Sequence, residues 1–321
     1  MRKKMAMRQT LLSAAVVMLV MGSIGYGVSA DPLVKTGGAQ AAHQTSAVTR
    51  SQAEAFAAVP DVEQDAHSHH EHMDMDMDME MELAPDNPGG MQVEWAWADG
   101  MPRAGEPATL RLTILDAEGM PVPAQQLEVN HEKKLHLIIV SRGLSRFMHV
   151  HPVDAGETGV FEVPITFAAA GDYKLIADFR PVGSGSIWRS DWARVQGEAS
   201  NEPVLLPDKQ LERSAEGMNV NLNFAHPPQA GVEDEMTFTF EQRADGAAVT
   251  DLEPYLGSVG HVVIVDSEIE HYLHVHPMNE RTAGPAATFS TTFPTSGQYK
   301  IWGQFQRGGS VIIVPFVVNV K

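Results

Sequence analysis

The sequence predicts an all-β protein with two tandem immunoglobulin-like β-sandwich domains. A stretch of roughly 105 residues occurs twice, at an offset of about 125 residues, which indicates a tandem duplication. Within each copy, short alternating runs are broken by Gly, Pro, Asp and Asn at intervals of about ten residues. No segment of the sequence has a convincing helical period. Several short strands at this spacing are typical of an immunoglobulin-like sandwich.

The composition excludes several classes of function. The chain has 321 residues, with 23 Lys and Arg, 41 Asp and Glu, and a formal net charge of −18. Such an acidic chain repels nucleic-acid phosphates and attracts cations, so we expect no nucleic-acid partner. Because the sequence has no Cys, disulfides, thiol nucleophiles and Cys-ligated zinc, iron–sulfur or blue-copper sites are excluded.

Residues 1–30 are expected to be a signal peptide or an N-terminal membrane anchor. A basic start is followed by an apolar run over 11–24 and then by Val28, Ser29 and Ala30, which suit cleavage. Cleavage is favoured, because the apolar run reaches only the lower limit for a spanning helix. The rest of the chain is then extracytoplasmic (secreted, periplasmic or at the cell surface). It is associated with a membrane only if the N-terminus is not cleaved.

Residues 31–90 are expected to form a disordered, acidic linker rich in His and Met. Segment 61–82 combines acidic residues with imidazoles, which suit copper and zinc, and with thioethers, which suit Cu(I). We expect it to be a flexible, secondary metal-capture segment, and the alternative is a solvated tail that binds nothing specific. The capturing side chains would be His67, His69, His70, His72, Met73, Met75, Met77, Met79 and Met81.

The two sandwich domains are predicted at 91–197 and 218–321, with an interdomain linker over 198–217. A Gly-Asp-Tyr sequence in the first copy matches Gly-Gln-Tyr in the second, and both precede a late strand, as at a sandwich corner. Upstream of this corner, three histidines recur at the same spacing. They are His136, His149 and His151 in the first domain and His261, His274 and His276 in the second.

The spacing of these histidines predicts that they converge. If the two runs that carry them form a hairpin with an even-length loop, the first and second histidine of each copy lie directly opposite each other. The third histidine, two residues further on, shares the same face. The proline after it should end the strand, which places the cluster near the surface at a sheet end. In the second copy the opposite, core-facing side would carry Val262, Ile264, Leu273 and Val275.

We therefore predict one three-His metal site in each domain. Three imidazoles fit Cu(II) or Zn(II), and copper is favoured because it binds such sites more tightly and because the linker is rich in Met. Zinc is the alternative metal. Three further histidines lack a counterpart in the other copy and are expected to be ordinary surface or turn residues; they are His131, His226 and His271.

The repeated domain resembles the YtkA-like domain of exported bacterial proteins. The resemblance rests on the His-Val-His-Pro strand and the closing Gly-x-Tyr-Lys-(Leu/Ile)-x-x-x-Phe stretch, and it covers 91–197 and 218–320. It implies copper handling, including copper delivery for respiratory oxidase assembly. The positions that match the His-x-His-Pro motif are His149, His151, His274 and His276. The duplication and the His/Met-rich linker are additional to a single-domain member.

These observations favour an exported metal-binding protein that acts as a copper chaperone, buffer or resistance factor and is not an enzyme. Its partners would be metal ions and an apo-metalloprotein acceptor such as a respiratory oxidase. One alternative is a structural or adhesive cell-surface module without a metal role. Another is a cupin-like metalloenzyme, because Glu280 follows His274 and His276 at a cupin-like spacing, although the first copy lacks this spacing.

Overall fold

The computed structural model describes residues 90–198 and 201–321. The predicted signal peptide or anchor and the predicted metal-capture segment lie outside these residues. The described part contains no α-helix; one short 3-10 helix, η2 (Ala124–Gln126), accompanies its strands. Within the same residues, no helix is long and apolar enough to cross a membrane. The all-β prediction is confirmed.

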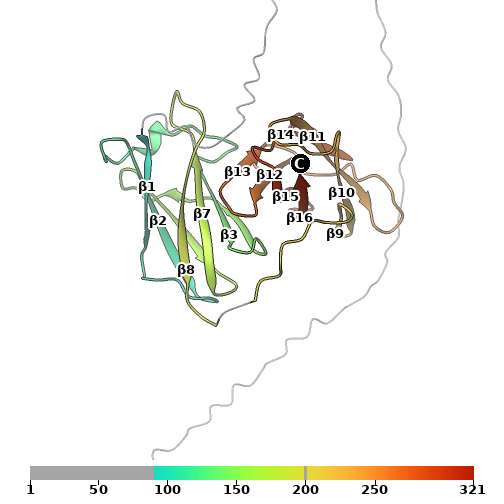
Figure 1. Cartoon of the computed structure of the whole chain (residues 1–321). Coiled ribbons are helices and arrows are strands. Elements are labelled where there is room, and N and C mark those ends of the chain that lie inside the picture. The colour runs from blue at the N-terminus through green and yellow to red at the C-terminus, as the bar shows by residue number, and fades with distance from the viewer. Residues whose placement is uncertain (1–89, 199–200) are drawn as a thin grey trace, which may run out of the picture. The chain divides into compact units, whose positions relative to one another are not determined.

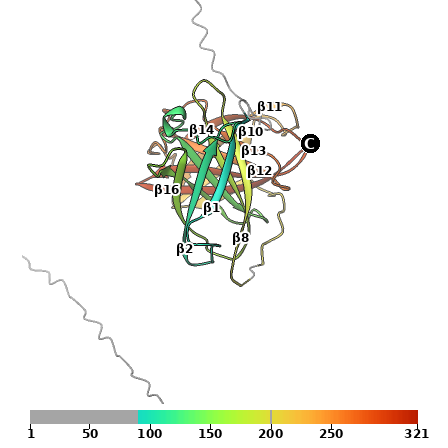
Figure 2. The ribbon, with the colours of Figure 1, turned by 90° about the vertical axis from the view of Figure 1, so that its left-hand side faces the viewer.

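The first repeat is a sandwich of two antiparallel four-stranded sheets, with strand orders β1-β2-β6-β5 and β4-β3-β7-β8. Figure 1 labels the main strands, and Figure 2 shows β1 and β2 side by side on one face of this repeat. The strands are β1 (Gln92–Trp97), β2 (Pro107–Leu115), β3 (Leu135–Ser141), β4 (Phe147–Val150), β5 (Val153–Asp154), β6 (Val160–Thr166), β7 (Gly171–Phe179) and β8 (Ile187–Val195).

The second repeat has the same plan, with strand orders β14-β11-β10-β9 and β13-β12-β15-β16. Its first strand, β9, pairs with β10 inside the region expected to be linker, so the linker ends earlier than 217. The strands are β9 (Glu212–Ala215), β10 (Met218–Phe224), β11 (Glu233–Gln242), β12 (Gly260–Asp266), β13 (Tyr272–Val275), β14 (Ala286–Thr292), β15 (Gly297–Arg307) and β16 (Ser310–Val320).

Each sandwich has its own hydrophobic core, built from the inward positions of alternating strands. In β2, Leu110, Leu112 and Ile114 are fully buried, while the intervening residues are only partly buried. This alternation is what a strand with one core face requires, because successive side chains point to opposite faces of the sheet. The core of the second sandwich includes Val262, Ile264, Leu273 and Val275, as the sequence predicts.

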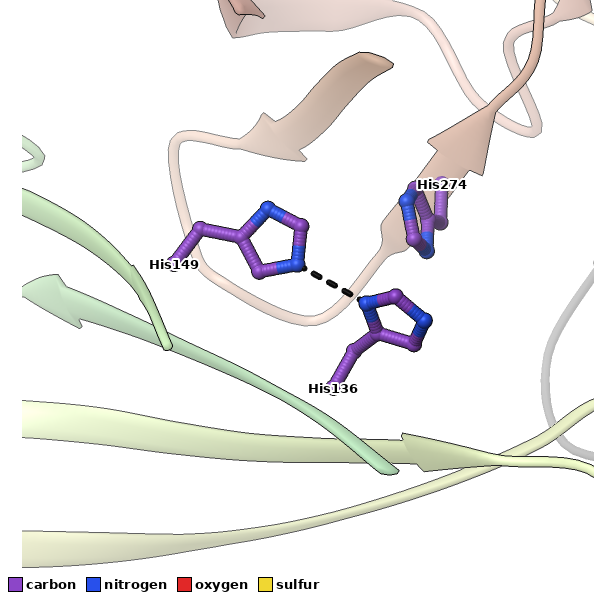
Figure 3. Close-up of side chains that lie close together, drawn as sticks. All are labelled: His136, His149 and His274. Atoms are coloured by element: carbon purple, nitrogen blue, oxygen red, sulfur yellow. Dashed lines mark hydrogen bonds between the residues drawn. The ribbon is translucent and has the colours of Figure 1, made fainter. Parts of the chain in front are cut away.

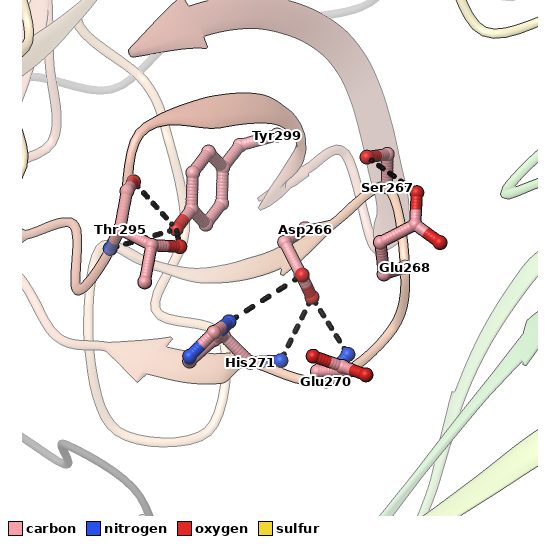
Figure 4. Close-up of polar contacts among 7 residues, drawn as sticks. All are labelled: Asp266, Ser267, Glu268, Glu270, His271, Thr295 and Tyr299. Atoms are coloured by element: carbon pink, nitrogen blue, oxygen red, sulfur yellow. Dashed lines mark hydrogen bonds and ion pairs between the residues drawn. The ribbon is translucent and has the colours of Figure 1, made fainter. Parts of the chain in front are cut away.

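A tyrosine corner fixes the start of one long strand in each repeat. The Tyr173 hydroxyl donates to the Ala169 carbonyl oxygen at 2.9 Å, and the Tyr299 hydroxyl donates to the Thr295 carbonyl oxygen at 2.9 Å (Figure 4). The strand begins with glycine in both repeats. Gly171 and Gly297 both have a φ of 144°, a backbone angle that residues with a side chain rarely adopt. The expected sandwich corner is therefore present in both repeats.

The hairpin that precedes each corner closes with a capped loop. In the second repeat, one carboxylate oxygen of Asp266 accepts the backbone N–H groups of Glu270 and His271 at 2.8 and 2.7 Å (Figure 4). In the first repeat, the Ser141 hydroxyl accepts the Arg146 backbone N–H at 3.1 Å. Because these bonds satisfy N–H groups that the strand ladder leaves unpaired, they hold each hairpin in one register.

The central strands β3 and β12 are buried at every position, which shows that both of their faces are covered. One face lies on the core of its own sandwich, and the other belongs to an apolar cluster that both repeats share. We call this the shared cluster. It contains Ile138, Val140, Leu144, Ile176, Val263, Val265, Ile269, Tyr272 and Trp302, with Phe147, Trp188 and Leu205 packed against it. Phe147 and Trp302 stack across it, with ring centroids 4.8 Å apart.

Candidate metal centre

The six predicted ligands do not form two separate sites. They lie in one cluster, joined by His131, at the end of the faces that carry the shared cluster. The seven members are His131, which precedes β3, His136 in β3, His149 in β4 and His151 just after it, His261 in β12, and His274 in β13 with His276 just after it. The prediction of one site per domain is therefore corrected to a single cluster to which both repeats contribute.

Ring-centroid distances show that the cluster is continuous. Within the first repeat, the rings of His136, His149 and His151 are 4.7 to 5.2 Å apart. Within the second, the corresponding three rings are 4.8 to 5.5 Å apart. Between the repeats, the His274 ring lies 5.2 Å from that of His136 and 5.7 Å from that of His149. The separation between repeats is thus as small as the separation within one.

The hairpin register differs from the predicted one by two residues. His149 lies opposite Ile138, and His274 lies opposite Val263, so the first and second histidines are diagonal neighbours instead of direct partners. A shift of two residues keeps every side chain on its face, whereas a shift of one would have reversed the faces. The prediction of direct opposition was wrong, but the predicted sharing of one face is confirmed.

The cluster lies deeper than the expected position near the surface. His136 is 1% exposed, His261 is 0% exposed and the His274 side chain is 1% exposed, while the other members are partly buried. The expectation failed because it considered each domain alone, whereas each repeat covers the outer sheet face of the other. Burial of neutral imidazoles is tolerable only if their ring nitrogens have partners.

Three of the histidines form a group that could hold one ion. One ring nitrogen from each of His136, His149 and His274 lies within 4.8 Å of the others. Figure 3 shows the three rings close together and marks the contact between His136 Nδ1 and His149 Nε2 at 3.0 Å. An ion about 2.0 Å from each imidazole nitrogen would hold its ligand nitrogens about 3.3 Å apart. The ring spacing is therefore close to what a metal site needs.

The far nitrogen of each of these rings already has an acceptor. His136 Nε2 donates to the Asn130 carbonyl oxygen at 3.0 Å, and His274 Nδ1 donates to the Asp178 carboxylate at 2.8 Å. His149 Nδ1 donates to the Gln304 side-chain oxygen at 3.0 Å. Metal-ligating histidines usually donate their second N–H to a carboxylate or carbonyl oxygen in this way.

These three bonds fix the tautomers and leave lone pairs that face one another. When His136 donates through Nε2 and His149 donates through Nδ1, neither neutral ring has a proton left for the 3.0 Å contact between them. Two facing lone pairs repel unless a cation lies between them. His274 Nε2 is likewise buried without a partner. The donor set thus fits a cation.

Burial also keeps the imidazoles neutral. Desolvation, followed by repulsion from neighbouring rings, holds the pKa values of His149, His261, His274 and His276 well below the ordinary value. Desolvation also lowers the pKa of His151, to about 4. Neutral imidazole is the form that binds metals, so protons do not compete for the cluster at neutral pH.

Asp178 and Gln304 occupy equivalent positions in the two repeats, and sequence reasoning missed both. Asp178 pairs with His136 across β3 and β7, and Gln304 pairs with His261 across β12 and β15. Each makes its hydrogen bond to a histidine of the other repeat. Burial raises the pKa of the Asp178 carboxyl, which also accepts the Tyr272 hydroxyl at 3.0 Å. The sequence feature that could have identified them is a polar residue at the equivalent position of two long, mainly apolar strands.

The remaining histidines divide as follows. His226 bonds Asp234 and its side chain is 81% exposed, while His271 belongs to the Asp266 loop, so both are the surface or turn residues expected. His131 also lies in a turn, as expected, but it is not an ordinary turn residue, because its ring stacks on that of His276 with centroids 3.8 Å apart. Glu280, the basis of the cupin-like alternative, is exposed.

A family model described as "Domain of unknown function (DUF8832)" matches residues 86–192 and again residues 213–321. The chain belongs to this family. The two DUF8832 matches coincide with the two sandwiches and confirm the tandem repeat. No curated protein matches the chain.

Several solved structures are similar to parts of this DUF8832 chain. The Escherichia coli adhesin FdeC is 18% identical, with 74% of this chain and 66% of that chain covered and a TM-score of 0.24. A Salmonella alpha-2-macroglobulin mutant is 15% identical over 75% of this chain and 15% of that chain, with a TM-score of 0.26. The Yersinia pseudotuberculosis adhesin InvE is 9% identical over 73% and 61%, with a TM-score of 0.23. None of these similarities bears on function.

Proposed function

We propose that this DUF8832 chain is an extracytoplasmic metal-binding protein whose two sandwiches hold an ion between them. The ligands are His136 Nδ1, His149 Nε2 and His274 Nε2. The observation that supports the proposal is that the far nitrogen of every one of these rings is occupied by an acceptor, while the near nitrogens face one another in a buried space. Hydrogen-bonded acceptors on the far side fix the tautomer and ring orientation that a metal requires.

Copper is the metal we propose, with zinc as the alternative. An all-imidazole donor set accepts both, and copper binds nitrogen ligands more tightly in the usual divalent order. The resemblance to YtkA-like domains and the Met-rich segment 61–82 add support for copper. Three protein ligands leave a further coordination position on a tetrahedral ion.

The burial of the ligands favours a holding role, as a buffer or resistance factor, over rapid delivery. The ion has to reach or leave nitrogens that are covered by the opposite repeat, so exchange needs the shared cluster to open. Delivery to an acceptor such as a respiratory oxidase would then proceed through the more exchangeable metal-capture segment predicted from sequence.

A second candidate function is a structural or adhesive cell-surface module. The tandem immunoglobulin-like sandwiches, joined through an apolar cluster, favour it, since this architecture serves many surface modules that bind no metal. In that case the imidazole cluster would bind no ion with useful affinity.

Metal titration of the full chain separates the two candidates. The nine His and Met side chains of segment 61–82 would be replaced by Ser, so that these predicted capture side chains no longer compete with the cluster for Cu(I), Cu(II) and Zn(II). We expect tight copper binding, of which one ion per chain is lost when His149→Gln and His274→Gln are combined and none is lost in His226→Gln, whose ring is exposed. An unchanged number of bound ions in the double variant, or no binding at all, would refute the proposed site and leave the structural module.

A further inference from the structure

Part of the histidine cluster is not used by the proposed site. After His136, His149 and His274 are assigned, four rings remain: His131, His151, His261 and His276. Three of them are mutual neighbours. The His131 and His276 centroids are 3.8 Å apart, those of His131 and His261 are 4.8 Å apart, and those of His261 and His276 are 5.5 Å apart.

His261 is the most informative of these three rings. Its side chain is 0% exposed, and neither Nδ1 nor Nε2 has a hydrogen-bond partner. Whichever tautomer it adopts, a neutral ring therefore buries one lone pair that nothing contacts. His276 Nε2 is also buried without a partner. A buried polar atom without a partner costs about 1–3 kcal/mol, so an arrangement with several of them needs an explanation.

The backbone at His131 gives an independent indication. His131 and Glu132 have φ of 45° and 64°, and the flanking Asn130 and Lys133 form a bridge, so the two residues occupy the centre of a tight turn. Such turns normally carry Asn or Gly at these positions, because side chains disfavour positive φ. The equivalent turn of the second repeat carries Gly257 at its second position. The strained turn of the first repeat places the His131 ring on His276.

We propose that His131, His261 and His276 form a second metal site, so that the cluster is a two-metal centre. This inference rests on the proposed function, because the first ion occupies the neighbouring three-His group. The His261 and His274 ring centroids are 5.4 Å apart, so ligands of the two sites are in direct contact. The two ions would consequently influence each other through this pair of rings.

The charge balance indicates which ion fits best. Within the described part of the chain, Asp178 is the buried carboxylate that contacts the cluster. Two divalent ions would leave more uncompensated charge in a buried place than two monovalent ions would. Imidazole ligands accept copper in either oxidation state. Monovalent copper is thus the ion that best suits both sites at once.

The number of ions per chain tests the proposal. The full chain with segment 61–82 replaced as above would be titrated with Cu(I) against a chelator, and bound copper counted by elemental analysis. We expect two ions per chain. His131→Gln combined with His276→Gln should reduce the count to one, and His149→Gln combined with His274→Gln should also remove one. His226→Gln and His271→Gln, which change histidines outside the cluster, should leave two.

A second measurement keeps the result interpretable if a variant folds poorly. In the protein that carries only the replacement of segment 61–82 and is loaded with Cu(II), the electron paramagnetic resonance spectrum should show coupling between two nearby ions, whereas protein loaded with one ion per chain should show none. One ion per chain, with no coupling and no loss in the His131 and His276 variant, would refute the second site while leaving the first intact. No ion at all would instead refute the proposed function. The two failures are therefore distinguishable.

Discussion

Acid should separate the two repeats of the metal-free protein before it unfolds either sandwich. The buried cluster histidines have lowered pKa values in the docked state and ordinary values, near 6.5, once the cluster opens. Above pH 6.5 these rings are neutral in both states, so the free energy of docking does not change with pH. As the pH falls below 6.5, only the open state takes up protons, and docking is progressively weakened.

The size of the effect follows from the number of rings. At pH 5.5, one unit below the ordinary pKa, each ring that stays neutral when docked contributes about 1.4 kcal/mol in favour of opening. Counting only His149, His261, His274 and His276, the sum has an upper limit of about 6 kcal/mol, because the three rings of one repeat stay neighbours after opening and repel each other's protons. Even part of this sum is comparable with the stability of a small domain. Asp178 acts in the opposite direction, because its raised pKa lets the docked state hold a proton more readily, but it is a single group.

The assay follows docking and folding by separate signals. Trp302 is 3% exposed in the shared cluster, so its fluorescence reports docking, and Trp302→Phe identifies its contribution. Far-ultraviolet circular dichroism reports the sandwiches themselves. We expect the fluorescence transition at a higher pH than the loss of dichroism, and a shallower transition in His276→Gln than in His226→Gln. Coincident transitions, or docking that is unchanged down to pH 4.5, would show that the rings are not buried as a docked cluster.

Two further predictions concern the packing that supports the site. Tyr299→Phe removes the hydroxyl that donates to Thr295 and should lower the free energy of unfolding by about 1 kcal/mol without changing metal stoichiometry, as measured by urea denaturation. Trp302→Ala removes the ring that stacks on Phe147 and should weaken docking by about 3–5 kcal/mol, measured by the pH at which the repeats separate; an unchanged pH would mean that the shared cluster does not hold them together.

Much of the fold could be predicted because the determining signals are local. Alternation in β2 identified a strand with one core face, and the repeated Gly-x-Tyr identified the corner that Tyr173 and Tyr299 form. Because the domain is duplicated, each strand and turn could be predicted from two separate stretches of sequence. The sharing of one face by the histidines was predictable for the same reason, since it depends only on whether the hairpin loop is even or odd.

The single shared site could not be predicted, because it depends on how the repeats dock. The runs in β3 and β12 are apolar without alternation, which indicates strands covered on both faces. That pattern does not say what covers the second face. Treated one domain at a time, the histidines at the ends of these strands appear to lie at the surface. Docking converts two exposed triads into one buried cluster and brings Asp178 and Gln304 to the opposite repeat.

The carboxylate of Asp178 predicts that the two proposed metal sites differ in affinity. Asp178 lies behind His274 and Gln304 lies behind His149, so both support the first site. In the second site, by contrast, neither ring nitrogen of His261 has a hydrogen-bond partner. A carboxylate that accepts the far N–H makes the imidazole a stronger ligand than an amide does, and loss of such a partner typically lowers metal affinity by about 10- to 100-fold. The site that contains His274 should therefore fill first. Asp178→Asn should weaken that site by this factor and leave the other site unchanged, as measured by chelator competition. Equal effects on both sites would mean that Asp178 acts through the net charge of the cluster and not through His274.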